Sequence, residues 1–374
     1  MNFNQTLAQL STFVKDEYAI KSLRDLMQQT LVDESVSLAN TFRLVPGVKT
    51  GDPLGWLGSM QPLGWAGSGC DPEYKHAAVQ YAGKKWELGE WQLPLKWCYK
   101  EFESTLAEYA LKKGADISKL EGTEIWSILI EGPVAKAVAK MWWRIIWFGD
   151  KQIAENHAAD LTTAVPASPT QDPYAKVANI PNISNDLFTI CNGLFKQFEA
   201  QGVTNTAIDA NTKTTTALQF SELRKPGVAT GIIESVLENA DSRIKGNGGK
   251  LFVTDSIATA LTKDLRNTYK NSTMMTWDIL ENGLKISQFD GVEIVAVNMW
   301  DQMIQEFFNN GTKLYNPHRV VFANKENLLV GTPENSVNAD LEVNFDNISR
   351  NTFMYGTGKI GTNLGEEGLI HTAY

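Results

Sequence analysis

Alternating apolar and polar residues mark one clear strand near residue 95. In the stretch "EWQLPLKWCY" the apolar side chains fall on every second position and are separated by Gln92, Pro94, Lys96 and Cys98. The alternating apolar residues are Trp91, Leu93, Leu95, Trp97 and Tyr99. A period of two is typical of a β-strand with one buried face, and a proline inside it indicates an edge strand or a bulge.

A helical period follows between residues 123 and 148. Apolar residues recur three and four positions apart, and Trp143 and Trp147 widen the apolar band. They are Val134, Val138, Met141, Trp142, Ile145 and Ile146. Pro133 removes a backbone hydrogen bond, so we expect one long bent helix or two helices in series, ending at "FGD" (148–150). The tryptophans Trp142, Trp143 and Trp147 are expected in the core.

The second half of the chain alternates helices and strands, after a proline-rich crossing segment at 151–186. "NDLFTICNGLFKQFEAQG" and "GVATGIIESVLENADSRIKG" predict two helices, the second ending at Gly246. A strand is expected at Leu251–Val253, followed by a helix with Ser256 as N-cap. An Asp290-Gly291 turn precedes another strand, and "HRVVFANKENLLVGTPE" predicts a hairpin of strands 320–323 and 328–330.

Residues 46–89 interrupt this order with frequent Gly and Pro beside Trp56, Trp65 and Trp86. Such a long segment is uncommon in a compact domain, and an isolated two-stranded ribbon is only marginally stable in water. Two interpretations cover the tryptophans equally well at this point. Either the chain's own core buries them, or a projecting ribbon docks on another subunit.

Composition narrows the class of protein. A chain of 374 residues can bury one large core or two moderate ones, so two lobes or a core with extensions are expected. The formal net charge of −9, from 34 basic and 43 acidic residues, has the wrong sign for gripping nucleic-acid phosphates. Three cysteines without a CxxC pair favour a reducing, intracellular setting, and we expect neither a signal peptide nor a membrane span.

Candidate chemistry is sparse, and we predict no catalytic, cofactor-binding or metal-binding residue. His76, His157, His318 and His371 are isolated and lack metal-ligand spacing. "KGNGGK" (245–250) resembles a phosphate loop, but a helix is predicted before it and a strand after it, so a turn is expected. Cys70 and Cys98 could approach each other on a ribbon, although two free thiols are the simpler interpretation. A structural or binding protein is therefore favoured over an enzyme.

The order of these parts resembles the major capsid proteins of tailed bacteriophages, whose fold is named after the coliphage Hong Kong ninety-seven. "KKWELGEWQLPLKWCYKEFE" is similar to the returning strand of that family's extended loop, and "TEIWSILIEGPVAKAVAKMWWRIIWFGD" to its spine helix with a Gly-Asp end. "GGKLFVTDSIATALTKDLRNTYKN" and "FDGVEIVAVNMW" resemble its apical domain, and "HRVVFANKENLLVGTPE" the return to the peripheral domain. "CDPEYK", "PLKWCYKEFE" and "ANKENLLVGT" look most like the crAss-like phages.

The resemblance implies an α+β fold with five consecutive parts. These are an N-terminal arm (1–46), an extended β loop (47–100), a peripheral domain with the spine helix at 123–148 (101–182), an inserted apical α/β domain (183–316) and a return to the peripheral domain (317–374). It also implies subunit contacts made by tryptophans of the extended loop, namely Trp56, Trp65, Trp86, Trp91 and Trp97. On this interpretation Trp91→Ala impairs assembly more than it impairs folding of the monomer.

The implied function is that of a shell subunit. Such a protein assembles with itself as pentamers and hexamers into an icosahedral virion capsid around double-stranded DNA, in the host bacterial cytoplasm. Its partners are a separate scaffold protein, a portal, and decoration or head-fibre proteins, with no sequence-specific DNA binding, no membrane and no cofactor. Two alternatives remain, an encapsulin-type nanocompartment shell and, from another class, an α/β hydrolase or nucleotide-binding enzyme.

Overall fold

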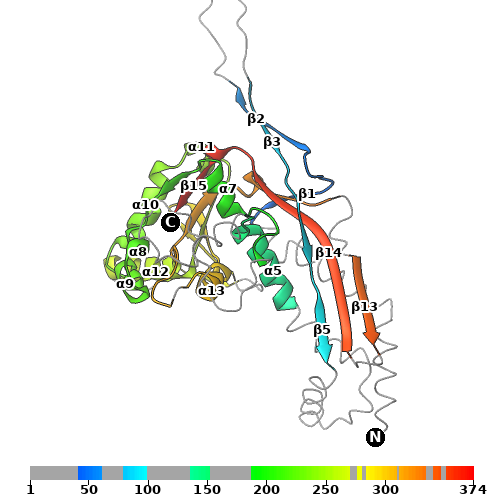
Figure 1. Cartoon of the computed structure of the whole chain (residues 1–374). Helices are drawn as coiled ribbons and strands as arrows, with labels where there is room; N and C mark the ends of the chain where they lie inside the picture. Colours follow the sequence, from blue (N-terminus) through cyan, green and yellow to red (C-terminus); the bar gives the residue numbers. More distant parts are fainter. Residues whose placement is uncertain are drawn as a thin grey trace, which may run out of the picture.

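The computed structural model describes residues 41–60, 79–98, 135–151, 187–269, 276–279, 284–309, 311–333, 340–346 and 351–374. Within them, two larger sheets and a separate two-stranded ribbon organise the chain (Figure 1). The mixture of helices and strands agrees with the α+β class predicted from the sequence.

The larger sheet has seven strands in the order β6-β15-β11-β7-β10-β9-β8. Its strands span Thr204–Thr206, Ile370–Ala373, Val320–Ala323, Lys250–Val253, Val292–Ala296, Lys285–Phe289 and Asp278–Ile279, in that order. Neighbours β7 and β10 run parallel, whereas β11 runs antiparallel to β7. The turn between β9 and β10 lies at Asp290 and Gly291, as predicted, and both residues have positive φ angles (48° and 75°).

Both faces of the seven-stranded sheet are covered, which explains its nearly uninterrupted apolar strands. One face packs against buried residues of α8 (Asp209–Thr212), α9 (Thr216–Leu223), α10 (Val228–Asn239), α11 (Ser242–Gly246) and α12 (Asp255–Tyr269). The other face packs against α5 (Ala135–Phe148), α7 (Leu194–Ala200) and α13 (Asn298–Phe307). Phe252 of β7 points to the second face, while Leu251 and Val253 point to the first.

The second sheet has six strands built around the long strand β14 (Asn351–Leu364). β14 pairs with β13 (Asp340–Asp346), with β12 (Leu328–Gly331), and with both β4 (Gly89–Gln92) and β5 (Leu95–Cys98). β1 (Arg43–Val45) adds in parallel to β12. The sequence predicted a single strand here, with Pro94 marking an edge strand or a bulge. The structure has two strands instead, because β4 and β5 are separated at residues 93–94 on the same side of β14.

The ribbon consists of β2 (Pro53–Met60) and β3 (Val79–Lys85), which among the described strands pair with each other alone. In Figure 1 it extends away from the two larger sheets. Its register shifts between Leu57 and Met60, the position of a bulge or irregularity. A ribbon in this region was predicted from the sequence, and the structure gives its two strands and their register.

The expected hairpin at 318–334 is wrong in its pairing, although its strands are correct. β11 and β12 occupy the predicted residues, and the short 3-10 helix η5 (Lys325–Asn327) fills the expected turn. The two strands do not pair with each other: β11 joins the seven-stranded sheet and β12 joins the six-stranded one. Residues 317–374 therefore supply strands to both sheets.

Three helix predictions also change. The chain at 187–190 forms turns, and α7 begins only at Leu194, because Gly193 donates its N–H to the carbonyl of Gly149 at 2.7 Å and lies against the end of α5. The helix expected to reach Gly246 is split, since Asp241 caps a new helix, α11. Ser256 is not an N-cap; the carboxylate of Asp301 accepts the N–H groups of Asp255 (2.7 Å) and Ser256 (3.3 Å).

Candidate functional site: the projecting ribbon and its root

The ribbon is joined to the rest of the molecule at a short segment that we call the ribbon root, residues 49–54 and 84–88. Trp86 is its central side chain and is only 3% exposed, in a small cluster with Val48 and Leu329. A Cβ atom at Gly331 would lie 2.5 Å from the Trp86 ring, so the ring packs directly on the glycine backbone of β12. The aromatic ring thus fixes the root onto the six-stranded sheet.

Backbone hydrogen bonds continue the pairing of the ribbon through the root. Trp86 donates its N–H to the Asp52 carbonyl at 2.9 Å and accepts the N–H of Gly51 at 2.8 Å. The N–H of Lys49 is bound by the Asp52 carboxylate at 2.7 Å, and Val48 donates to the carbonyl of Thr332 at 3.0 Å. These bonds connect β2 to β3 and connect the chain before β2 to the residue after β12.

Lys84 supplies polar contacts between the ribbon root and the six-stranded sheet. The Lys84 ammonium donates to the carbonyls of Leu364 (3.0 Å) and Gly365 (2.6 Å) and forms an ion pair with Glu367 at 2.7 Å. Its side chain is 14% exposed, which shields these charge-assisted bonds from water. Beside it, Asn363 donates to the Lys85 carbonyl at 3.2 Å. The last two residues of β3 are therefore held against the end of β14 and the segment that follows it.

The chain that returns from the ribbon carries a second buried tryptophan, Trp91 of β4. It is 2% exposed and meets Trp142 of α5 edge to face, with ring centroids 5.3 Å apart. Trp91 pairs across the strands with Gly358 of β14, where a Cβ atom would come within 2.6 Å of the indole ring. The side chain therefore lies between β14 and α5, inside the chain's own core.

The burial of Trp86 and Trp91 bears on the prediction that tryptophans of the extended loop form subunit contacts. Trp86 and Trp91 are covered by the chain itself, so the own-core interpretation accounts for both. For Trp56 in β2 and Trp97 in β5 the structure describes the backbone only, and Trp65 lies outside the described residues. An interfacial role for Trp56, Trp65 and Trp97 stays a prediction.

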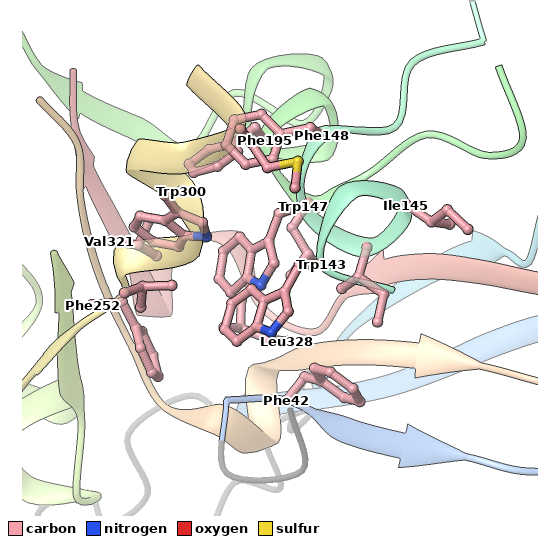
Figure 2. Packing of buried hydrophobic residues seen from close by; sticks show 14 of the residues in the cluster. Phe42, Trp143, Ile145, Trp147, Phe148, Phe195, Phe252, Trp300, Val321 and Leu328 are labelled. Atoms are coloured by element: carbon pink, nitrogen blue, oxygen red, sulfur yellow. The ribbon is translucent and has the colours of Figure 1, made fainter. Parts of the chain in front are cut away.

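Helix α5 connects the ribbon side of the molecule with the seven-stranded sheet. Seven of its last eight residues are buried apolar side chains, and Arg144, the exception, donates to the Leu187 carbonyl. Figure 2 shows Trp143 and Trp147 projecting between Trp300 of α13 and Leu328 of β12, and the Trp147 and Trp300 centroids are 4.7 Å apart. The expectation that Trp142, Trp143 and Trp147 are core residues is confirmed.

The "FGD" end of this helix is also confirmed, and its aspartate is buried. Asp150 donates its N–H to the Phe188 carbonyl at 2.8 Å, and its carboxylate lies 3.5 Å from the Lys196 ammonium. Gly149 contacts backbone that leaves no space for a side chain, since a Cβ atom there would lie 2.3 Å from the Cys191 carbonyl oxygen. The glycine and aspartate thus join the end of α5 to the start of α7.

A polar pocket of about 390 Å³ lies beside the ribbon root. Its lining residues are Lys84, Lys85, Glu87, Asn192, Gln197, Gln201, Asn363 and Glu367. Three of its charged side chains are in ion pairs, Lys84 with Glu367 at 2.7 Å and Glu87 with Lys151 at 2.6 Å. Carboxamides and balanced charges are unsuited to a hydrophobic cofactor, whose pockets are mostly apolar.

The structure brings together one pair that the sequence did not predict, a serine and a histidine. Ser256 Oγ lies 2.9 Å from Nδ1 of His318, which is fully buried. Burial lowers the pKa of His318 to about 4, which keeps the imidazole neutral. Within the described residues, Nε2 of His318 has no hydrogen-bond partner and no carboxylate orients the ring, while Asp301 accepts the N–H groups of Asp255 and Ser256. In that part of the chain the pair therefore lacks the third member and the oxyanion site of a catalytic triad.

The remaining predictions on chemistry can be checked in part. "KGNGGK" runs from the end of α11 into β7 through a turn with Gly248 at φ 73°, as expected. Nε2 of His371 lies 2.9 Å from Thr206 Oγ1, whereas His76 and His157 fall outside the described residues. Cys191 is buried and not in a disulfide, and burial raises the pKa of its thiol to about 12. Cys70 and the Cys98 side chain are outside the description.

The described part of the chain contains no group of three His, Cys, Asp or Glu side chains that could hold a metal ion. No helix among the described residues has both the length and the apolar character needed to cross a bilayer.

Comparison with known proteins gives a match in structure but not in sequence. No family model and no curated protein sequence matches the chain. A chain of the satellite phage P4 procapsid that includes the size determination (Sid) protein matches with a TM-score of 0.50 and 12% identity, over 94% of this chain and 98% of that one.

Two further solved structures match with lower TM-scores. The capsid of an empty GTA particle matches at a TM-score of 0.42 and 11% identity, over 91% and 90% of the two chains. Gordonia phage Cozz matches at 0.44 and 8%, over 90% and 84%. At these identities a likeness concerns the fold alone. The chain therefore has a fold similar to that of a subunit of the P4 procapsid along nearly its whole length.

Proposed function

We propose that this chain is the major capsid protein of a tailed bacteriophage. On this proposal it is a structural protein that assembles with itself as pentamers and hexamers into an icosahedral shell around double-stranded DNA. The observation that carries the proposal is the fold shared with the P4 procapsid chain over 94% of this chain. The ribbon supports it, because a pair of strands with no third strand beside it in the described chain is marginal in water unless something else covers it.

The parts of the subunit follow from this proposal. The ribbon β2–β3 and the returning strands β4 and β5 correspond to the extended loop, and α5 to the spine helix. The seven-stranded sheet with helices α7 to α13 corresponds to the apical domain, with strands from residues 317–374 included. Trp56, Trp65 and Trp97 are proposed to contact the neighbouring subunit. The narrower assignment to the crAss-like phages rests on the sequence segments quoted above.

The proposed partners are those of a phage head. A second copy of the chain is the principal partner, joined by a separate scaffold protein, the portal, and decoration or head-fibre proteins. Assembly takes place in the host bacterial cytoplasm. The net charge of −9 suits a container for DNA, because an acidic wall does not hold the packaged phosphates tightly.

Electron microscopy of the recombinant chain tests the proposal. We expect closed particles built from pentameric and hexameric rings when the chain is expressed alone or with the scaffold protein encoded beside it. Nuclease-protected double-stranded DNA in particles from infected cells distinguishes a phage head from a nanocompartment, which would hold an enzyme instead. Sedimentation as monomers under every condition, with or without scaffold, would contradict the proposal.

A further inference from the structure

The direction of the ribbon depends on a few residues at its root. β2 and β3 pair with no other strand of the described chain, so no third strand fixes the angle between the ribbon and the sheets. The attachment at residues 49–54 and 84–88 must hold that angle. Lys84 is a polar anchor at this root, with two carbonyls and one carboxylate within 3.0 Å of its ammonium.

Immediately beyond Lys84, two glycines face each other across the ribbon. The register pairs Leu54 with Lys84 and then Gly55 with Gly83. Cross-strand side-chain pairs are the unit of sheet stabilisation, and a glycine pair contributes none. Glycine inside a strand also has the greatest backbone freedom of any residue. The ribbon therefore has little side-chain support against bending at this pair, directly above a fixed root.

Among the described atoms, none explains the absence of a side chain at Gly83. A Cβ atom there would have no described atom within 4 Å, and the φ angle of Gly83 is not in the left-handed region that favours glycine. In contrast, Gly331, Gly358 and Gly361 are each in close contact with a neighbouring ring or backbone, so packing explains them. Gly83 differs because neither packing nor a positive φ requires a glycine.

We infer that the facing pair Gly55 and Gly83 is a hinge on which the ribbon bends, and that Lys84 is the positioning residue that fixes the root beneath it. Bending at one cross-strand pair changes the direction of the whole ribbon without breaking the contacts of Trp86 or Lys84. If the chain is a shell subunit, as proposed above, this freedom lets identical ribbons meet neighbours at different angles in pentamers and hexamers. The hinge itself does not depend on that function.

The test measures the ribbon angle in the unassembled full chain. Gln80 and Glu238 are each replaced by a ketone-bearing residue and spin-labelled, which leaves the cysteines untouched, and the distance distribution between them is recorded. Gly83→Val adds a β-branched side chain into open space and should narrow the distribution about two-fold. Lys84→Met keeps the length of the side chain but removes the ammonium, and it should broaden the distribution about two-fold.

Two controls keep the result interpretable. Gly231→Ala, at an equally open glycine inside α10, should leave the distribution unchanged. Gly83→Thr replaces Gly83→Val if the valine variant aggregates. A distribution that stays the same width in both Gly83 variants overturns the hinge, and an unchanged width in Lys84→Met overturns the positioning role. Because no step requires a shell, these outcomes are independent of whether the chain forms particles.

Discussion

At the scale of single residues, close contacts between glycine and tryptophan define the ribbon root. Gly331 leaves space for the Trp86 ring, and Gly358 does the same for Trp91. Since both rings are buried, neither can move outward into solvent without losing its apolar contacts. Gly331 and Gly358 allow the tryptophan rings to pack, whereas Gly83 is proposed to let the ribbon bend.

The Gly331→Ala substitution tests the first contact. Its new Cβ atom would lie 2.5 Å from the Trp86 ring, which must shift within its small cluster, so we expect a loss of about 1–3 kcal/mol in the free energy of unfolding. Urea denaturation of the unassembled chain measures it. The matched control, Gly231→Ala in α10, has no atom near its Cβ and should gain about 0.5–1 kcal/mol. Equal effects of the two substitutions would refute the packing argument.

A buried carboxyl gives a prediction on pH. Burial raises the pKa of Asp301 to about 7, and the N–H groups of Asp255 and Ser256 that bind its carboxylate partly oppose this increase. The nearby Asp255 carboxylate is paired with the Lys285 ammonium at 2.6 Å. Because the pKa is higher in the folded than in the unfolded chain, this group favours folding fully below about pH 4, and its contribution disappears as the pH rises through 7.

We expect the free energy of unfolding to fall by on the order of 2 kcal/mol between pH 4 and 7. Each unit of pKa shift corresponds to about 1.4 kcal/mol, and the expected fall is smaller than the full shift would give. Asp301→Asn removes the titrating proton and keeps an oxygen for the cap, so its stability should lack this slope. Urea titrations across the range compare the two chains. The idea fails if the slope is the same in both.

At the scale of elements, the sequence located strands and turns better than it paired them. The strands of "HRVVFANKENLLVGTPE" and the Asp290-Gly291 turn were predictable because alternation and turn residues are local signals. The separation of β11 and β12 into two sheets was not predictable, since a short apolar run does not specify its partner. The early start expected for α7 failed because the contact of Gly193 with Gly149 lies 44 positions away in sequence.

The residues of the ribbon root could likewise be predicted from the sequence only in part. Sequence reasoning identified Trp86 and Trp91 as important and weighed an own-core explanation, but only the structure shows Gly331 and Gly358 beneath their rings. Lys84 and Gly83 were missed, because the short run "AGKKW" contains no pattern that separates an anchoring lysine from a surface one. The Ser256–His318 contact was missed because it joins residues from separate elements.

Trp91 now supports a prediction opposite to the one made from the sequence. Trp91→Ala removes a side chain that lies between β14 and α5, so we expect the unassembled chain to lose about 3–5 kcal/mol of unfolding free energy. Denaturation followed by circular dichroism measures the loss. A stability equal to that of the unmodified chain would return Trp91 to the interface.

Trp56→Ala serves as the counterpart. Its side chain is predicted to contact a neighbouring subunit, so the substitution should leave the unfolding of the unassembled chain unchanged and lower the yield of particles at least several-fold. Denaturation and particle counting by electron microscopy give the two readings. A marked loss of monomer stability with Trp56→Ala would place this residue in the core as well.

At the scale of the whole molecule, one hydrophobic cluster joins the two sheets. It contains Phe252 and Val321 from the seven-stranded sheet and Val330 and Ile360 from the six-stranded one, with α5 between them (Figure 2). Figure 1 shows α5 lying between the two regions of the fold. Chains longer than about 250–300 residues usually divide into separate cores, and this shared cluster opposes such a division.

We therefore expect the unassembled chain to unfold in a single cooperative transition. Because the shared cluster would be exposed if either sheet unfolded, neither sheet should remain folded alone. Differential scanning calorimetry checks this by comparing the calorimetric and van't Hoff enthalpies, which should agree. Two resolved heat-absorption peaks would show instead that the sheets are independent units.

The position of β15 affects how the protein is made. This strand, Ile370–Ala373, lies between β6 and β11 and pairs with both, yet it follows the other six strands of its sheet in chain order. During translation the seven-stranded sheet cannot be completed until those residues have left the ribosome, so the other six strands emerge before β15 is available to pair. A nascent chain that is interrupted before Ile370 leaves β6 and β11 unpaired on their facing edges, and it is a target for chaperones and proteases rather than a finished subunit.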